Sequence, residues 1–287
     1  MTKHGLSFDI EDWHQLSAMR IGRPTPDASE DVERCVARIL DVCDEAQVKA
    51  TFFVVGLLAR RRPQLVREIA ARGHEVASHS DQHRLIHQMP LTELAEDLRT
   101  SKQMLEDLAG TEVVGFRAPE FSVQRLDHPC FTVLREQGFE YDSSVFPIPG
   151  LRYGIENAPR VPFSFDTPAG RLVELPLATT SIAGRQLPIA GGSGWRLLPT
   201  RFLTWAADRA EARGETLIFY FHPYEFTKRL VYLSGGLKPN LKIAKHVVLH
   251  NFATYRIARS LRRILSRLQF EPLRTLAAAR RELEHRA

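Results

Sequence analysis

The stretch GLSFDIED at residues 5–12 decides the fold, because it is an apolar strand pattern that ends in three carboxylates within four residues. Further apolar strand patterns lie at 50–55, 74–78, 113–117, 139–143, 171–177 and 216–221. Helical patterns lie at 31–47, 63–73, 92–109, 126–137 and 199–213. Apolar strands that alternate with helices are typical of a parallel sheet covered on both faces, or of a closed barrel. About seven strands in the first ~220 residues favour the barrel, so we expect an α/β fold.

The composition indicates an ordinary folded protein. The 287 residues allow one large domain or two small ones. The chain is 44% hydrophobic and 25% charged, and its mean hydropathy is -0.23. These values exclude a collagen, a disordered chain and a bundle of membrane spans.

The charge is distributed unevenly along the chain. The net charge is +5, but residues 228–287 hold 14 Lys and Arg against 3 Glu, a net of +11, which leaves -6 for residues 1–227. The alternation of strands and helices also stops near residue 228, whereas the Pro- and Gly-rich residues 146–170 are expected to form a long ordered loop. We therefore expect a barrel over 1–227 and a basic C-terminal helical extension over 228–287, packed on or flanking it.

The cysteines and the N-terminus point to the cytoplasm. Cys35, Cys43 and Cys130 show no metal or disulfide spacing and are expected to be buried, reduced thiols. Residues 1–10 carry no apolar signal-peptide region, and no apolar run approaches the ~18 residues of a membrane span.

Titratable side chains follow five of the expected strands. In parallel α/β folds the carboxyl ends of the strands carry the functional groups. Because five strand ends carry such groups here, we expect them to form one site. These residues are Asp9, Glu11 and Asp12 after the first strand, His79 and His83, Arg117, Asp142 and His222.

His79 and His83 are the sharpest element of this site. A spacing of four places two imidazoles on one face of a helical turn, as a divalent metal requires. Two surface histidines on a helix are the simpler alternative, and a solvated acidic turn is the alternative for the three carboxylates. A carboxylate from another strand end would complete a 2-His-1-carboxylate set with open positions, which is typical of a catalytic metal site.

Arg117 and His222 have functional and structural interpretations. Arg117 ends an apolar strand before Ala-Pro, which favours a fixed partner for a buried carboxylate over a surface salt bridge of about 0–1 kcal/mol. His222 lies between Phe221 and Pro223 and could be a packed core residue. A nearby carboxylate would instead hold it protonated enough to act as an acid near neutral pH.

These elements, in this order, resemble the polysaccharide deacetylases with the NodB homology domain, carbohydrate esterase family 4. The resemblance covers about residues 5–225 and implies a distorted (β/α)7 barrel that removes acetyl groups from sugars with a divalent metal, most often zinc, with Co2+ or Ni2+ as alternatives. It implies that Asp9 is the catalytic base and that His79 and His83 bind the metal. The third ligand falls on Glu11 or Asp12, because the carboxylates here are spaced apart.

The remaining motifs carry over with changes. Arg117 would orient the base, and the backbone N–H of Glu120, which replaces the family's Tyr, would donate to the oxyanion. Its neighbours Pro119 and Phe121 are expected to contact substrate. Asp142 would orient His222, the general acid.

Two further segments resemble the members found in bacterial exopolysaccharide loci. They are Tyr153-Gly154-Ile155 and Gly191-Gly192-Ser193-Gly194-Trp195, and those members also carry a basic C-terminal extension. Trp195 could stack on a sugar ring, or could equally be a core residue.

The resemblance implies a metal-dependent hydrolase that removes N-acetyl groups from an N-acetylhexosamine-containing glycan or its lipid-linked precursor. A metal-independent cyclic-amide hydrolase resembling allantoinases is one alternative, against which the intact His79/His83 motif argues. A non-catalytic carbohydrate-binding protein on the same fold is another, supported by the altered first motif and by Glu120.

The extension contains one amphipathic helical pattern. Its apolar stripe comprises Phe252, Tyr255, Ala258, Leu261, Ile264, Leu265 and Leu268, with Arg256, Arg259, Arg263 and Arg267 outside it. A helix packed on the barrel with a solvated basic face is the simpler expectation, and contact with an anionic inner membrane surface is the alternative. Nucleic-acid binding is not favoured, because the extension has few aromatic residues and no recognised motif.

Overall fold

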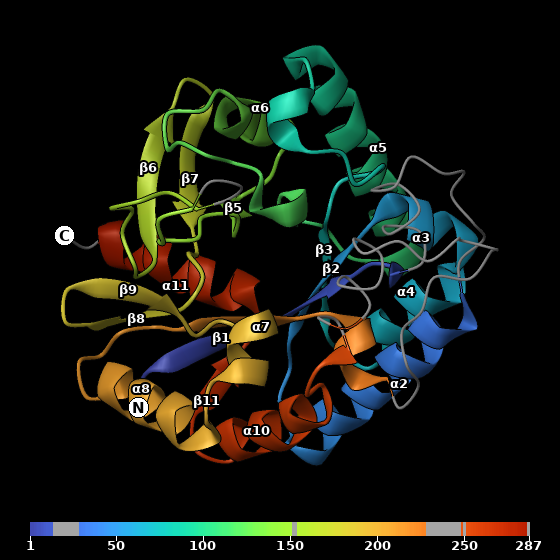
Figure 1. Cartoon of the computed structure of the whole chain (residues 1–287). Coiled ribbons are helices and arrows are strands. Elements are labelled where there is room, and N and C mark those ends of the chain that lie inside the picture. The colour runs from blue at the N-terminus through green and yellow to red at the C-terminus, as the bar shows by residue number, and fades with distance from the viewer. Residues whose placement is uncertain (14–28, 151–153, 228–247, 249–250, 286–287) are drawn as a thin grey trace.

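The computed structural model describes residues 1–13, 29–150, 154–227, 248 and 251–285 (Figure 1). The strands are β1 (Lys3–Ile10), β2 (Thr51–Val54), β3 (Glu75–Ser78), β4 (Gly115–Phe116), β5 (Tyr141–Asp142), β6 (Phe163–Thr167), β7 (Gly170–Glu174), β8 (Thr179–Ile182), β9 (Arg185–Pro188), β10 (Ile218–Phe221) and β11 (Gln269–Glu271). The α-helices are α2 (Glu30–Glu45), α3 (Gly56–Arg61), α4 (Pro63–Ala71), α5 (Leu91–Ala109), α6 (Cys130–Glu136), α7 (Gly192–Leu197), α8 (Thr200–Glu211), α10 (Tyr255–Leu265) and α11 (Leu273–His285). Short 3-10 helices are η1 (Ile86–Gln88), η2 (Pro119–Phe121) and η3 (Pro223–Phe226).

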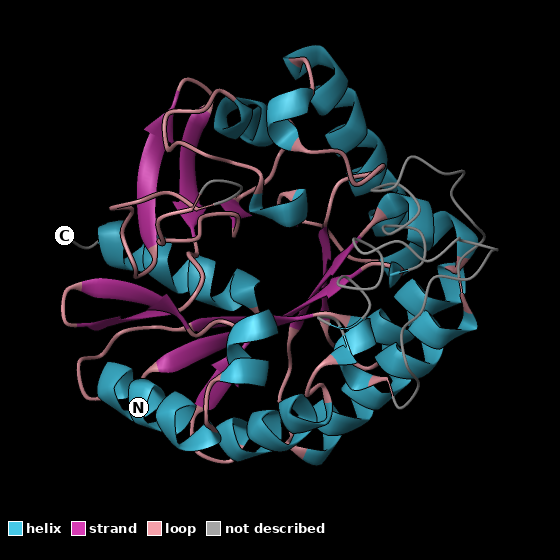
Figure 2. Ribbon diagram, viewed as in Figure 1, coloured by secondary structure: helices cyan, strands magenta, loops and turns pink. Residues whose placement is uncertain are grey.

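One curled sheet forms the centre of the molecule. Its strand order is β10-β1-β2-β3-β4-β5-β7-β6, and all neighbours are parallel except β6 and β7. Helices lie around the outside of the sheet (Figure 2). The expected α/β barrel is thus confirmed in a distorted form, in which the two outer strands β6 and β10 do not pair within the described residues.

The sequence pattern explains the local structure of the first units. In α2 the apolar positions at helical spacing are buried against the sheet, Cys35 and Cys43 among them. Cys130 is also buried, and all three cysteines are free thiols, as predicted. The long helix α5 ends at Gly110, whose φ of 67° is the left-handed conformation that favours glycine at a helix end.

The region expected to be one long loop contains a strand that the sequence analysis missed. Within 146–170, β6 pairs antiparallel with β7, and a separate hairpin, β8–β9, follows. The side chains of β6 are half-buried or exposed, so the segment lacks the continuous apolar run by which the parallel strands were recognised.

The C-terminal extension continues the barrel, contrary to the expectation that the strand and helix alternation stops near residue 228. Strand β11 pairs in parallel with β1, so that Lys3 lies opposite Gln269 and Gly5 opposite Glu271. Figure 1 shows the red C-terminal elements beside the blue N-terminal strand. The strand was missed because it has only three residues, and the charge change at 227 therefore marks no structural boundary between sheet and extension.

Helix α10 is amphipathic, but its buried face differs from the predicted stripe. Leu261, Ile264 and Leu265 are buried as expected, whereas Phe252 is 55% exposed and Tyr255 is 81% exposed. Several basic side chains bind partners within the protein: Arg256 donates to the carbonyls of Arg196 and Leu198, Arg262 pairs with Glu45, and Arg267 pairs with Asp208. These contacts match the simpler expectation of a helix packed on the barrel.

Helix α11 is anchored to the amino-terminal ends of the central strands. The N–H of Leu273 donates to Oγ1 of Thr51 at 2.7 Å, and the N–H of Arg274 donates to Oε2 of Glu75 at 3.0 Å. Glu75 also accepts hydrogen bonds from Thr51 Oγ1 at 2.6 Å and from the Tyr141 hydroxyl at 2.8 Å. These side chains satisfy backbone donors that a helix start leaves unpaired.

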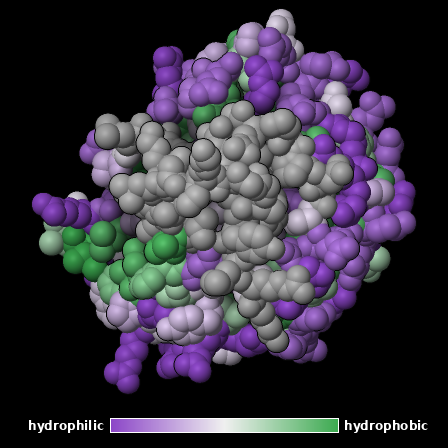
Figure 3. Space-filling model, turned by 45° about the vertical axis from the view of Figure 1, so that its right-hand side comes forward, coloured by the Kyte–Doolittle hydropathy of each residue, from purple (hydrophilic) through white to green (hydrophobic). Residues whose placement is uncertain are grey.

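The described surface is mixed. On the face in Figure 3, hydrophilic residues predominate, and apolar residues gather at the left of the view. Among the described helices, none has both the length and the apolar character needed to cross a bilayer.

Candidate metal centre

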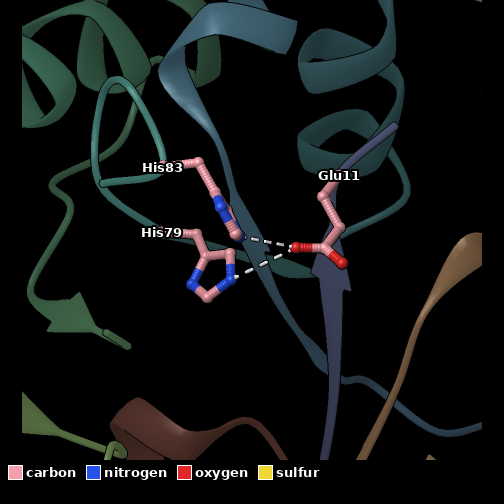
Figure 4. Close-up of side chains that lie close together, drawn as sticks. All are labelled: Glu11, His79 and His83. Atoms are coloured by element: carbon pink, nitrogen blue, oxygen red, sulfur yellow. Dashed lines mark ion pairs between the residues drawn. The ribbon is translucent and has the colours of Figure 1, made fainter. Parts of the chain in front are cut away.

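Glu11, His79 and His83 meet at the carboxyl ends of β1 and β3 (Figure 4). One ligand atom from each residue lies within 4.8 Å of the others. Oε2 of Glu11 is 2.8 Å from Nε2 of His83 and 3.7 Å from Nε2 of His79. All three side chains are buried, so water does not screen their interactions.

Glu11, not Asp12, joins the histidines. Side chains alternate between the two faces of a strand, so Glu11 continues the face of Asp9 beyond the end of β1. Asp12 falls on the other face, where its carboxylate accepts a hydrogen bond from the backbone N–H of Ser29. The structure thus does not bring the predicted ligand Asp12 into the cluster.

His79 is oriented by a backbone contact. Its Nδ1 lies 2.8 Å from the carbonyl oxygen of Arg117. A carbonyl only accepts hydrogen bonds, so Nδ1 carries the proton and Nε2 presents its lone pair toward Glu11.

The loop 79–83 is not helical, so the prediction that a helical turn aligns the two histidines is wrong. Ser80 and His83 adopt left-handed backbone conformations with φ of 64° and 56°. The N–H of His83 donates to Oγ of Ser80 at 2.8 Å, and the carboxylate of Asp97 on α5 accepts hydrogen bonds from the N–H groups of Asp81 and Gln82. His87 continues the spacing of four, but it lies on the surface outside the cluster.

The donor set fits a divalent cation. Nε2 of His83 is buried and forms no hydrogen bond, although Oε2 of Glu11 lies 2.8 Å away. Burial raises the pKa of Glu11, but the close imidazoles of His79 and His83 and the charge of His222 outweigh burial and hold the pKa well below its usual range. Two imidazole nitrogens and one carboxylate oxygen are the protein ligands of many catalytic zinc sites.

Beside this cluster, Arg117 binds Asp9. Nη1 of the fully buried Arg117 donates to Oδ1 of Asp9 at 2.7 Å and lies 2.8 Å from Oγ of Ser7. Nε and Nη2 donate to the carbonyl and hydroxyl oxygens of Ser143, and the guanidinium stacks 4.1 Å above the ring of Phe53. The partner expected for Arg117, a buried carboxylate, is therefore Asp9.

The segment after Arg117 is conformationally unusual. Glu120 and Phe121 both have φ of 52°, a left-handed conformation that costs about 1–3 kcal/mol in a residue other than glycine. Glu120 is half-buried, whereas Pro119 and Phe121 are buried. The ring of Phe121 packs edge-on against Phe146 and Tyr220, which leaves only a small part of it for the predicted contact with substrate.

His222 follows β10 and lies between two carboxylates. Its Nε2 is 3.6 Å from Oε1 of Glu11, and its Nδ1 is 3.6 Å from Oε2 of Glu225. Tyr224 stacks on the imidazole ring, with centroids 5.1 Å apart. Burial lowers the pKa of His222, but Glu225 and Glu11 outweigh burial and raise it to about 9.

The predicted partner of His222, Asp142, does not contact it. Asp142 accepts hydrogen bonds from the hydroxyl and the N–H of Ser144, and the Ser144 hydroxyl in turn accepts from the N–H of Ala118. Asp142 also lies opposite Glu174, and burial raises the pKa of both carboxyls, so the two can share a proton. Asp142 therefore supports the 117–121 segment.

Glu225, the carboxylate that does lie beside His222, was missed in the sequence. It lies three residues after His222, the spacing of a capping box, and this spacing was the signal that could have indicated it.

Trp195 is a core residue, so the expectation that it stacks on a sugar is wrong. It is fully buried, its Nε1 donates to the carbonyl of Ile189 at 2.7 Å, and its ring packs edge-on against Phe219 and Phe221. The adjacent Gly191 contacts the backbone of Tyr220 so closely that a Cβ would overlap it. Tyr153, expected to belong to the same feature, lies outside the described residues.

Two protein-family models match the chain. Residues 25–141 match the family described as Polysaccharide deacetylase, and residues 143–278 match a Domain of unknown function (DUF3473). The second match runs across residue 227, in agreement with the pairing of β11 and β1.

Similar proteins include deacetylases that act on carbohydrates. Over 91 residues, the chain is 37% identical to a chitooligosaccharide deacetylase from Sinorhizobium fredii, which covers 32% of this chain and 38% of the relative. Over 103 residues, it is 26% identical to a peptidoglycan-N-acetylglucosamine deacetylase from Bacillus cereus, which covers 36% and 46%. The chain thus matches less than half of the length of these relatives.

A solved structure with a similar fold is that of a putative polysaccharide deacetylase from Mycobacterium smegmatis. It aligns with a TM-score of 0.67 at 20% identity and covers 99% of this chain and 92% of that chain. The two proteins share the fold over nearly their whole length.

Proposed function

We propose that the protein is a metal-dependent carbohydrate N-deacetylase of the NodB-like, carbohydrate esterase 4 type, because residues 25–141 match the Polysaccharide deacetylase family. It would hydrolyse the acetamide of an N-acetylhexosamine-containing glycan to a free amine and acetate. The observation that carries this proposal is the buried set of Glu11, His79 and His83 beside the Asp9–Arg117 pair. In this set, Nε2 of His83 forms no hydrogen bond.

Glu11, His79 and His83 would hold the cation. A divalent ion such as Zn2+ acts as a Lewis acid that polarises the acetyl carbonyl and makes water a stronger acid. The contact of His79 with the carbonyl of Arg117 keeps Nε2 available as a ligand, and the buried position of all three side chains limits competing water.

The other residues supply proton transfer and charge stabilisation. Asp9, fixed by Arg117, would accept the proton of the attacking water. The N–H of Glu120 would donate to the oxyanion, and the loss of one such donor typically slows a reaction about 10²–10³-fold. His222, whose pKa Glu225 and Glu11 raise against the effect of burial, would donate a proton to the departing amine.

The finer assignments rest on the resemblance. We infer a substrate in bacterial surface polysaccharide synthesis, either the glycan or a precursor attached to a lipid diphosphate, and a cytoplasmic location. Contact of the extension with an anionic membrane surface stays a prediction, and it is weakened because Arg262 and Arg267 are already paired with acidic residues.

The test compares two histidines of the same loop. His83→Ala should lower the bound zinc of the full-length protein to background and slow acetate release from N-acetylglucosamine oligomers at least about 10³-fold, because the cation loses a ligand. Metal content is measured by mass spectrometry and acetate by an enzyme-coupled assay.

His87→Ala is the matched control, since His87 has the same sequence spacing but lies at the surface. It should keep both the metal and the rate of the wild type. A wild type that holds no metal and opens a cyclic amide instead of releasing acetate would support the cyclic-amide hydrolase alternative, and one that binds metal but hydrolyses neither amide would support the non-catalytic one.

A further inference from the structure

His222 has neighbours on several sides of its ring. Tyr224 stacks on one face of its ring, and Tyr220 contacts it edge-on with centroids 5.5 Å apart. These contacts leave the two ring nitrogens directed at Glu11 on one side and Glu225 on the other. A ring that must give up a proton from Nε2 needs its Nδ1 side fixed.

Glu225 is placed to fix that side. It is 1% exposed, and its Oε2 accepts a hydrogen bond from the backbone N–H of His222 at 3.0 Å. The same oxygen lies 3.6 Å from Nδ1 of His222. The backbone N–H of Glu225 also donates to the carbonyl of His222. The backbone and the side chain of Glu225 are therefore both bonded to the residue that precedes the 3-10 helix η3.

The contact between the two side chains is close but incomplete. Nδ1 of His222 and Oε1 of Glu225 are both buried and form no hydrogen bond. Catalytic hydrogen bonds are often long in a free enzyme and tighten in the complex with substrate. The acidic group that the family resemblance assigns to this role, Asp142, is bound to Ser144 and Glu174 instead.

We infer that Glu225 is the positioning residue of His222 and replaces Asp142 in orienting the general acid. The inference rests on the proposed deacetylase function. Glu225 acts through His222, because its contacts are with the backbone and the ring of that residue, and it does not belong to the metal set of Glu11, His79 and His83.

The kinetic test uses the metal-loaded, full-length protein with N-acetylglucosamine oligomers. Glu225→Ala should lower kcat about 10²-fold, within the contribution of a general acid, with KM and bound zinc within about twofold of the wild type. Glu225→Gln keeps an oxygen acceptor at the same position and should lose less than about tenfold. Glu215→Ala, before the amino end of β10, removes a glutamate that pairs with Arg213 and Arg160 outside the site, and as the control it should keep the wild-type rate.

A double-variant cycle separates positioning from a general structural effect. If Glu225 acts through His222, the variant with both His222→Ala and Glu225→Ala should be no slower than His222→Ala alone. A kcat for Glu225→Ala within about twofold of the wild type overturns the inference, as does a double variant in which the two losses multiply.

A spectroscopic measurement tests the inference even if the wild type releases no acetate, an outcome that would count against the proposed function instead. In 15N spectra of the metal-loaded protein, the ring signals of His222 are identified with His222→Gln. Glu225→Ala should shift these signals and leave those of His79 and His83 in place. Unchanged His222 signals would show that Glu225 does not orient the ring.

Discussion

Two buried glutamates lie at opposite ends of the same sheet and have opposite surroundings. Glu75, at the amino end of β3, accepts hydrogen bonds from Thr51, Tyr141 and the backbone of Arg274, which are all neutral donors. Glu11, beyond the carboxyl end of β1, faces three imidazoles, and those of His83 and His222 each have a buried nitrogen that forms no hydrogen bond. Burial raises the pKa of Glu75, whereas the histidines hold the pKa of Glu11 well below its usual range.

The difference separates a structural carboxylate from a functional one. A buried polar group whose partners all come from the protein itself adds stability and specifies how the elements pack. A buried group left with an unpaired neighbour costs stability, and such sites persist where another binding partner completes them. Mutations at the amino end of the barrel should therefore change mainly the stability of the protein, whereas mutations at the carboxyl end should change mainly metal binding and rate.

The largest expected effect is at the amino end. Glu75→Ala should lower the free energy of unfolding by about 3–5 kcal/mol, because it leaves buried donors of Thr51, Tyr141 and Arg274 without an acceptor. Urea unfolding of the metal-free protein measures the loss, and the rate per folded molecule should stay that of the wild type.

Glu140→Ala is the control for this variant. Glu140 also contacts α11, through Arg281, but the pair lies near the surface and its loss should cost less than about 1 kcal/mol. An equal loss of stability in the two variants would contradict the comparison between the two ends of the sheet.

A smaller effect is expected behind the metal-binding loop. Asp97→Asn removes one of the two oxygens that hold the N–H groups of Asp81 and Gln82. The loop should then hold His79 and His83 less firmly and lower zinc affinity about 10–100-fold, as changes around metal ligands commonly do. Competition with a coloured chelator measures the affinity.

Asp107→Asn, at an exposed position of the same helix α5, should leave zinc affinity unchanged. If Asp97→Asn destabilises the protein without a change in zinc affinity, the residue belongs with the structural carboxylates.

The smallest effect is a pH dependence. Burial raises the folded-state pKa of Glu75 above its value in the unfolded chain, so its favourable contribution is fully present below the unfolded pKa and is lost as pH rises through the folded pKa. Glu75→Gln cannot titrate. The free energy of unfolding of the wild type, minus that of Glu75→Gln, should therefore decrease from pH 4 to pH 8. An increase over this range would contradict the assignment of the pKa shift.

Much of the site could be predicted because it follows from a local rule. Asp9, His79, Arg117 and His222 each end an apolar run, and the carboxyl ends of parallel strands share one edge of the sheet. The same rule failed where strands lack an apolar run or are very short, as in β6 and β11.

The roles that depend on side-chain direction could not be predicted in the same way. The histidine spacing suggested a helical turn, but a loop with left-handed residues at Ser80 and His83 aligns the pair. For Trp195 the sequence allowed both a sugar platform and a core position, and the structure packs its ring against Phe219 and Phe221.

The sequence by itself determined the α/β alternation, the strand ends that carry chemistry and the pair of histidines, because hydrophobic periodicity is a property of neighbouring residues. Only the tertiary structure decided that Glu11 rather than Asp12 faces the histidines, that Glu225 rather than Asp142 faces His222, and that the basic extension completes the sheet at β1. Beyond the end of a strand, the direction of a side chain depends on loop geometry and on contacts with residues far away in the chain. The uneven charge that suggested two parts does not divide the fold, because β11 of the extension pairs with β1.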